Sequence, residues 1–338
     1  MSQLAPNPAP PSRLAAALAR TWAAFDPGDG VPATLWQAAL CEPLSEFARR
    51  PAKELRTMLC ELGWALGGGA GAVPEAVVLT IDALHTGSLI VDDVEDQATE
   101  RRGAPALHVL HGEPVAINAG TWLYFWALEQ LPALGGAAEA QLVMHRRTIA
   151  ALRGCHQGQA LDLRARVDQL DAGKLGAVCA AITRGKTATL VGLAMELAAL
   201  AAGAAAARAE RVGQLGVGVG TALQQLDDLG SLGKARRAKG HEDLRGHRVT
   251  WPWAWLPEVV DPLAVARFQQ RARRLTEAAA DLDGLADDLY EAVAGHGRRR
   301  IRLDAEQVLA QAHLDLGDHP ALTALAALLA RMEDSYGC

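Results

Sequence analysis

The chain has 338 residues, of which 50% are hydrophobic but only 4% aromatic, and its formal net charge is −6. Ala and Leu dominate the apolar content, and both favour helix over strand, so the composition predicts an all-α fold with a large core. The basic residues are scattered or lie in short clusters, which argues against a nucleic-acid-binding protein.

Apolar spacing with Pro and Gly punctuation predicts one helix after another, without a competing strand pattern. The stretches between the helices are too short for interdomain linkers, so we expect a single helical bundle with a central substrate cavity over residues 13–338. The predicted helices are 13–25, 33–48, 52–67, 74–97, 114–131, 137–164, 172–185, 187–207, 209–230, 251–256, 262–280, 283–294, 303–316 and 320–334.

Features of the termini and cysteines predict a cytoplasmic protein without stable membrane insertion. Residues 1–12 are rich in Pro and lack the basic-then-apolar order of a signal peptide, so they are predicted to form a disordered tail. Five cysteines form no close pair and no metal-ligand spacing. The most membrane-like stretch, 190–207, contains Glu196 and is interpreted as a buried core helix.

Asp92, Asp93 and Asp96 follow a strongly apolar helical run. Positions i and i+4 of a helix lie about 6 Å apart on one face, so two carboxylates there can bind a hard cation. Like charges at this spacing repel, which favours Mg²⁺ with a phosphate ligand over three unpaired acids. From the spacing alone, a solvated acidic helix end is an equally good interpretation.

A second acidic pair, Asp227 and Asp228, ends another apolar helix, and basic residues lie near each pair. This arrangement favours a binding site for a polyanion.

The run from Leu84 to His108, LHTGSLIVDDVEDQATERRGAPALH, closely resembles the first aspartate-rich region of trans-isoprenyl diphosphate synthases. Further blocks in the same order extend the resemblance over residues 50 to 255, and it is strongest to the geranylgeranyl diphosphate synthase branch. These blocks are Lys53–Arg56, His156–Gln159 with Asp162, Lys186–Thr187, Gln224–Asp228, Asp243–Leu244 and Arg248–Pro252.

The resemblance implies a Mg²⁺-dependent prenyltransferase that joins isopentenyl diphosphate head to tail to an allylic diphosphate. Three Mg²⁺ ions per site would be held by Asp92, Asp93, Asp96, Asp227 and Asp228. The allylic diphosphate would also contact Lys186, Arg101 and Arg248. The homoallylic diphosphate would bind Lys53, Arg56, His85 and Arg102. Gln224 and Thr187 would face the reacting carbons, with Gln159 and Asp162 in support, and a homodimer is implied.

Product length is expected to depend on the residues one turn before Asp92. Gly87 and Ser88 occupy these positions on the same helix face, and neither is bulky. A floor is then expected on the next helix from Trp122, Tyr124, Phe125 or Trp126, with Tyr124 and Phe125 the residues chosen, which predicts geranylgeranyl diphosphate. Ordinary core packing is an equally good interpretation for any one of these aromatic residues.

Two other functions remain open from the sequence. A class I terpene cyclase shares the fold and the first acidic motif, and Ser231 fits its second motif, although Ala235 stands where that motif ends in an acid. A non-catalytic subunit of a heteromeric prenyl synthase would keep the fold while losing metal ligands, whereas here the first motif is intact.

Overall fold

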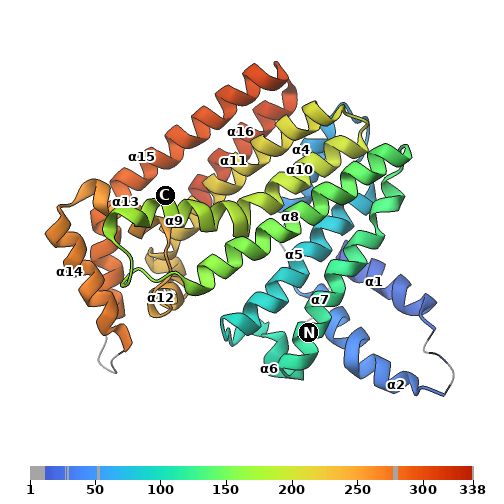
Figure 1. Cartoon of the computed structure of the whole chain (residues 1–338), viewed down its shortest axis with the longest axis horizontal. Coiled ribbons are helices and arrows are strands. Elements are labelled where there is room, and N and C mark those ends of the chain that lie inside the picture. Colours follow the sequence, from blue (N-terminus) through green and yellow to red (C-terminus); the bar gives the residue numbers. More distant parts are fainter. Residues whose placement is uncertain (1–11, 27, 29, 52–53, 277–280, 337–338) are drawn as a thin grey trace, which may run out of the picture. The chain divides into compact units, whose positions relative to one another are not determined.

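The computed structural model describes residues 12–26, 28, 30–51, 54–276 and 281–336. Throughout these residues the regular elements are helices, apart from one two-stranded hairpin (Figure 1). The predicted all-α fold is therefore confirmed. The predicted tail lies outside the described residues except for Ser12, whose hydroxyl accepts a hydrogen bond from the Ala15 N–H and begins the first helix.

Contacts divide the chain into two compact units, Met1–Met58 with Pro74–Ala137, and Leu59–Val73 with Ala138–Cys338. The single domain expected from the sequence stays a prediction.

In the first unit, α5 packs along α7 (Figure 1). Side chains on almost every face of α5 are buried. The close approach depends on glycine: a Cβ added to Gly87 of α5 would lie 2.6 Å from the Gly120 carbonyl oxygen of α7. The elements of this unit are α1 (Arg13–Ala24), α2 (Ala33–Trp36), η1 (Gln37–Cys41), α3 (Glu42–Arg49), the start of α4 (Leu55–Leu66), α5 (Glu75–Glu95), β1 (Glu100–Arg101), β2 (Ala104–Pro105), α6 (Leu107–His111), α7 (Glu113–Glu129) and η2 (Leu131–Leu134).

The hairpin of β1 and β2 was not predicted, because strands of two residues leave no pattern in the sequence. Arg102 and Gly103 form its turn, with φ values of 56° and 76°. A two-residue turn with positive φ at both positions matches the twist of antiparallel strands. The hairpin fixes Arg101 immediately beyond the end of α5.

In the second unit, α11 packs against α10, α15 and α16 (Figure 1). The predicted core helix at 190–207 corresponds largely to α10, whose residues from Gly192 to Leu200 are mostly buried. The elements are the end of α4, then α8 (Ala138–Arg164), η3 (Ala172–Lys174), α9 (Leu175–Ile182), η4 (Thr183–Ala188), α10 (Thr189–Ala201), α11 (Ala206–Ser231), η5 (Lys234–Arg236), α12 (Arg237–Arg245), α13 (Trp251–Val259), α14 (Pro262–Arg273), η6 (Arg274–Thr276), α15 (Leu282–Leu316) and α16 (Pro320–Tyr336).

Two predicted breaks were wrong. Residues 283–294 and 303–316 belong to one helix, α15, because Gly297 in the supposed gap is a packing position: a Cβ there would lie 2.6 Å from the Trp255 ring. The polar stretch 233–248 contains η5 and α12 rather than a loop, and Gly240 lets α12 approach the Ser231 carbonyl closely.

Among the helices of the described residues, none has the length and apolar character that a membrane span needs.

Candidate functional site

The first acidic motif lies at the end of α5. Asp92 and Asp93 are in its last turn, and Asp96 is the exposed residue that caps it. Asp93 is fully buried, whereas the Asp92 side chain is 18% exposed. The two residues are consecutive on one helical turn, so the Asp93 carboxylate lies inside the protein while the neighbouring Asp92 carboxylate reaches its surface.

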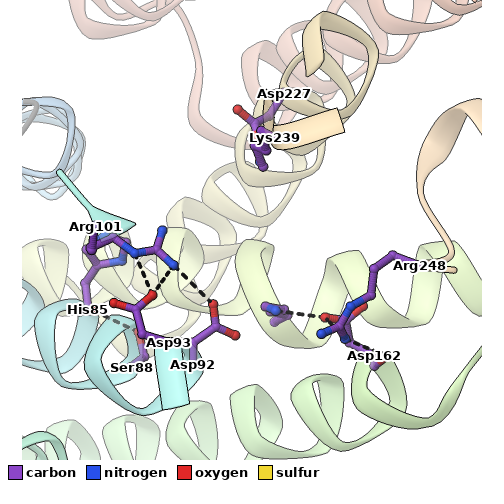
Figure 2. Close-up of polar contacts among 10 residues, drawn as sticks. His85, Ser88, Asp92, Asp93, Arg101, Asp162, Asp227, Lys239 and Arg248 are labelled. Atoms are coloured by element: carbon purple, nitrogen blue, oxygen red, sulfur yellow. Dashed lines mark hydrogen bonds and ion pairs between the residues drawn. The ribbon is translucent and has the colours of Figure 1, made fainter. Parts of the chain in front are cut away.

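Arg101 from the hairpin covers this pair (Figure 2). Its Nε donates to Asp93 Oδ1 at 2.7 Å, its Nη2 also contacts Oδ1, and the same Nη2 lies 3.9 Å from Asp92 Oδ2. Burial raises the pKa of Asp93, while the hydrogen bond and charge of Arg101 oppose that rise. The second oxygen of Asp93, Oδ2, is buried without a hydrogen-bond partner among the described residues.

An unpartnered buried carboxylate oxygen beside a second carboxylate suits a hard divalent cation. Within the described residues, however, no three acidic, histidine or cysteine side chains converge to form a complete metal site. Mg²⁺ is typically bound by one or two carboxylates together with waters and substrate phosphates. The donor set of α5 therefore fits Mg²⁺ if a phosphate ligand supplies the remaining oxygens.

Three of the four residues predicted for the homoallylic diphosphate interact in the first unit. Arg56 donates from Nε to Asp82 at 2.5 Å, and burial together with the charge of Arg56 lowers the pKa of Arg102 to about 10. The pKa of His85 is well below its ordinary value because of burial and the charges of these arginines, so its imidazole is neutral near pH 7. The fourth residue, Lys53, lies outside the described residues.

The residues predicted to set product length lie on α5 and α7. Ser88 donates its hydroxyl to the His85 carbonyl at 2.8 Å, and Tyr124 has its ring against Gly87. Phe125 follows Tyr124 on α7, and consecutive helix residues point about 100° apart. The Phe125 side chain is accordingly 64% exposed. Of the two chosen aromatic residues, Tyr124 lies against α5 and Phe125 does not, and the expectation that at least one of them forms the floor stays a prediction.

In the second unit, Asp162 of α8 holds two of the predicted cations (Figure 2). Lys186 Nζ lies 2.8 Å from Asp162 Oδ2, and Arg248 Nη1 lies 3.1 Å from the same oxygen and 2.9 Å from the Asp162 carbonyl. Gln159 precedes Asp162 by one turn of α8. The supporting role of Asp162 and Gln159 stays a prediction.

Thr187, Gln224 and Asp228 form a hydrogen-bonded chain. The Thr187 hydroxyl donates to Gln224 Oε1 and Gln224 Nε2 donates to Asp228 Oδ1, both at 2.7 Å. The second oxygen of Asp228 accepts from the Trp251 N–H at 2.9 Å. Burial is the main cause that raises the pKa of Asp228 to about 7, and the same cause raises the pKa of nearby Asp243 to about 6. The chain fixes the carbonyl of Gln224 and the hydroxyl of Thr187 relative to the acidic end of α11.

Asp227 is paired with two cations from residues 231–250, a stretch predicted to lie between helices. Arg236 Nη2 donates to Asp227 Oδ1 at 2.7 Å, and Lys239 donates to Oδ2. In the sequence, these two cations lie nine and twelve residues after Asp227. This spacing indicates a contact with Asp227 only if residues 234–245 are helical, as the structure shows. The Ser231 hydroxyl donates to the Asp228 carbonyl and is buried.

Comparison with known proteins gives consistent similarities. The family model described as Polyprenyl synthetase matches residues 37–287. A (2E,6E)-farnesyl diphosphate synthase of Mycobacterium tuberculosis is 30% identical over 276 residues, which cover 75% of this chain and 72% of that protein. A geranylgeranyl pyrophosphate synthase of Eremothecium gossypii is 29% identical over 135 residues, 38% of this chain and 42% of that protein, so the match spans less than half of that relative.

Solved structures share the fold. The polyprenyl synthase of Caulobacter crescentus, crystallised with calcium and isoprenyl diphosphate, superposes with a TM-score of 0.72 at 24% identity, covering 96% of this chain and 98% of the other. The geranylgeranyl pyrophosphate synthetase of Pyrococcus horikoshii gives a TM-score of 0.72 at 20% identity, covering 95% and 94%.

Proposed function

Because the chain belongs to the polyprenyl synthetase family of trans-prenyltransferases, we propose that it condenses isopentenyl diphosphate with allylic diphosphates, head to tail and with Mg²⁺, to give geranylgeranyl diphosphate. The family and enzyme class predicted from the sequence are confirmed by these matches. The product, the metal and the site residues are the proposal.

The observation that carries the proposal is the acidic end of α5. Asp92 and Asp93 lie side by side, Arg101 covers one oxygen, and Asp93 Oδ2 is buried without a hydrogen-bond partner among the described residues. This arrangement supports binding of a cation that is itself bound to a phosphate.

The proposed metal ligands are Asp92, Asp93, Asp96, Asp227 and Asp228, for three Mg²⁺ ions. Bound there, Mg²⁺ would stabilise the negative charge that grows on the diphosphate oxygens as the allylic C–O bond breaks.

The chain's cations would bind and orient the two diphosphates. Lys186 and Arg248 share Asp162, which keeps both cations at fixed positions, and Arg101 would contribute from the hairpin. These three would contact the allylic diphosphate. On the homoallylic side, we propose Lys53, Arg56, His85 and Arg102.

The residues proposed to face the reacting carbons, Thr187 and Gln224, would offer dipoles whose orientation is fixed by the chain of hydrogen bonds to Asp228. Apolar surroundings would exclude water from the carbocation until the homoallylic double bond attacks. The departing diphosphate is the proposed proton acceptor.

The proposed product length rests on the packing of α5 against α7. Neither Gly87, which packs closely on α7, nor Ser88 carries a bulky side chain one turn before Asp92, and Tyr124 lies beside Gly87 as the proposed floor. Two copies of the chain are proposed to associate, as the family resemblance implied.

One experiment separates the possible functions. The purified chain is incubated with isopentenyl diphosphate, Mg²⁺ and each allylic primer in turn, and the alcohols released by phosphatase are identified by mass spectrometry. A C20 alcohol is expected. Cyclic hydrocarbons formed from a primer alone would instead identify a terpene cyclase, and the absence of any product would favour a non-catalytic subunit.

A further inference from the structure

Asp227 on α11 has both carboxylate oxygens occupied by cations of its own chain. Arg236 of η5 donates to Oδ1 at 2.7 Å and Lys239 of α12 donates to Oδ2. The Asp227 side chain is 19% exposed, and those of Arg236 and Lys239 are 32% and 43% exposed. The pairings are thus at the protein surface, where small ions can compete with them.

Arg236 also contacts an aromatic ring of the C-terminal helix, α16. Its guanidinium carbon lies 4.5 Å from the centre of the Tyr336 ring on α16. The ring itself is seated on α11, since a Cβ added to Gly230, one turn after Asp227, would lie 3.1 Å from Tyr336 Cδ1. Tyr336 therefore fixes Arg236 over the end of α11.

The guanidinium is incompletely satisfied in this position. Its Nη1 atom is buried and has no hydrogen-bond acceptor among the described residues. Leaving a buried donor unpaired costs free energy, which offsets part of what the ion pair with Asp227 contributes. An arginine held by one carboxylate oxygen and one aromatic ring is more easily displaced than one with all its donors paired.

We propose that Arg236, held by Tyr336, competes with divalent metal ions for Asp227, so that the C-terminal helix tunes the metal affinity of the second acidic motif. The inference rests on the proposed function, in which Asp227 is a metal ligand. It adds a positioning role for two residues to which the family resemblance gave none.

The physical basis is competition for one oxygen. A Mg²⁺ or Mn²⁺ ion at Asp227 Oδ1 competes with Arg236 Nη2 for that oxygen, because a guanidinium that stays nearby repels the ion. The apparent metal affinity is therefore reduced by the stability of the Arg236–Asp227 pair. Removing the guanidinium or its aromatic support should strengthen metal binding.

The test is a titration of the full chain with Mn²⁺ alone, following free Mn²⁺ by its electron paramagnetic resonance signal. Arg236→Gln should tighten binding about two- to fivefold, the range expected for loss of a partly exposed ion pair. Arg245→Gln, the same charge change at an exposed position of α12, is the matched control and should shift the affinity less. Tyr336→Leu should also tighten binding, whereas Tyr336→Phe keeps the ring and should resemble wild type.

In an Asp227→Asn background, Arg236→Gln should no longer have an effect. Equal Mn²⁺ affinities of wild type and Arg236→Gln, or weaker binding by the variant, would overturn the inference while leaving the proposed function intact. If neither wild type nor Arg236→Gln bound Mn²⁺, the inference would be lost, whereas the proposed function, in which a substrate phosphate completes the metal site, would stand.

Discussion

Gly158 of α8 lies directly against the backbone of Lys186 in η4: a Cβ added to Gly158 would be 2.3 Å from the Lys186 nitrogen. Gly185 faces it, and a Cβ there would be 2.5 Å from the Gly158 Cα. Two glycines thus let the π-helical turn that carries Lys186 and Thr187 approach α8.

Gly158→Ala should lower the free energy of unfolding by about 1–3 kcal/mol, because the added methyl group forces the two backbones apart. Gly176→Ala is the control, since a Cβ at Gly176 of α9 meets no atom within 4 Å. It should be neutral or raise stability by up to about 1 kcal/mol. Urea unfolding of the three proteins measures this, and equal stability of Gly158→Ala and wild type would contradict the packing argument.

Asp92→Ala should reduce the rate of condensation by about two orders of magnitude or more, since a lost metal ligand removes charge stabilisation where the leaving group forms. Glu95→Ala removes an exposed acid from the same turn of α5 and should retain activity. Circular dichroism should show unchanged helix in both variants. Undiminished condensation by Asp92→Ala would refute the proposed metal site.

Arg56→Ala should mainly raise the KM for isopentenyl diphosphate, by roughly tenfold, with a smaller change in kcat. The truncation also leaves Asp82 without its partner at 2.5 Å, adding a negative charge near an anionic substrate. Asp82→Asn keeps the guanidinium and should change this KM less. A rise in KM confined to the allylic primer would show that the two pockets are assigned the wrong way round.

His85 should make the folded chain less stable in acid. Its folded pKa lies well below the ordinary value of 6.5 because of burial and the charges of Arg56, Arg102 and Arg101. The unfolded chain therefore binds a proton that the folded chain does not, and stability falls as pH drops below about 6.5. The loss from this residue is at most about 1.4 kcal/mol per pH unit.

His85→Gln should reduce the loss of stability between pH 7 and pH 5, measured by urea unfolding at each pH. An identical pH dependence in wild type and variant would indicate that His85 does not titrate differently in the two states.

Tyr124→Ala should lengthen the product by one or more five-carbon units, because the ring beside Gly87 would no longer limit the growing chain. Phe125→Ala removes a neighbouring ring of similar size that is 64% exposed, and should leave the product unchanged. Mass analysis of the dephosphorylated alcohols distinguishes these outcomes. If the product shifted only in Phe125→Ala, the floor would have to be placed on the other face of α7.

The sequence alone was sufficient for the fold class, the family and the acidic motifs. Apolar spacing and the spacing of Asp92, Asp93 and Asp96 are local properties of a helix, so one sequence displays them directly. Local patterns also gave most helix boundaries to within a few residues. They failed where a glycine has a tertiary role: Gly297 was interpreted as a break although it packs under Trp255 inside α15.

Only the tertiary structure decided which charges meet. Asp162 pairs with Lys186 and Arg248, which are 24 and 86 residues away, and Arg236 lies between Asp227 and Tyr336. A charged residue has no periodic signature that names its partner, because an ion pair depends on the packing of whole helices rather than on nearby sequence. The exposure of Phe125 next to Tyr124 has the same origin: both are aromatic, and only the packing of α7 on α5 separates the two faces.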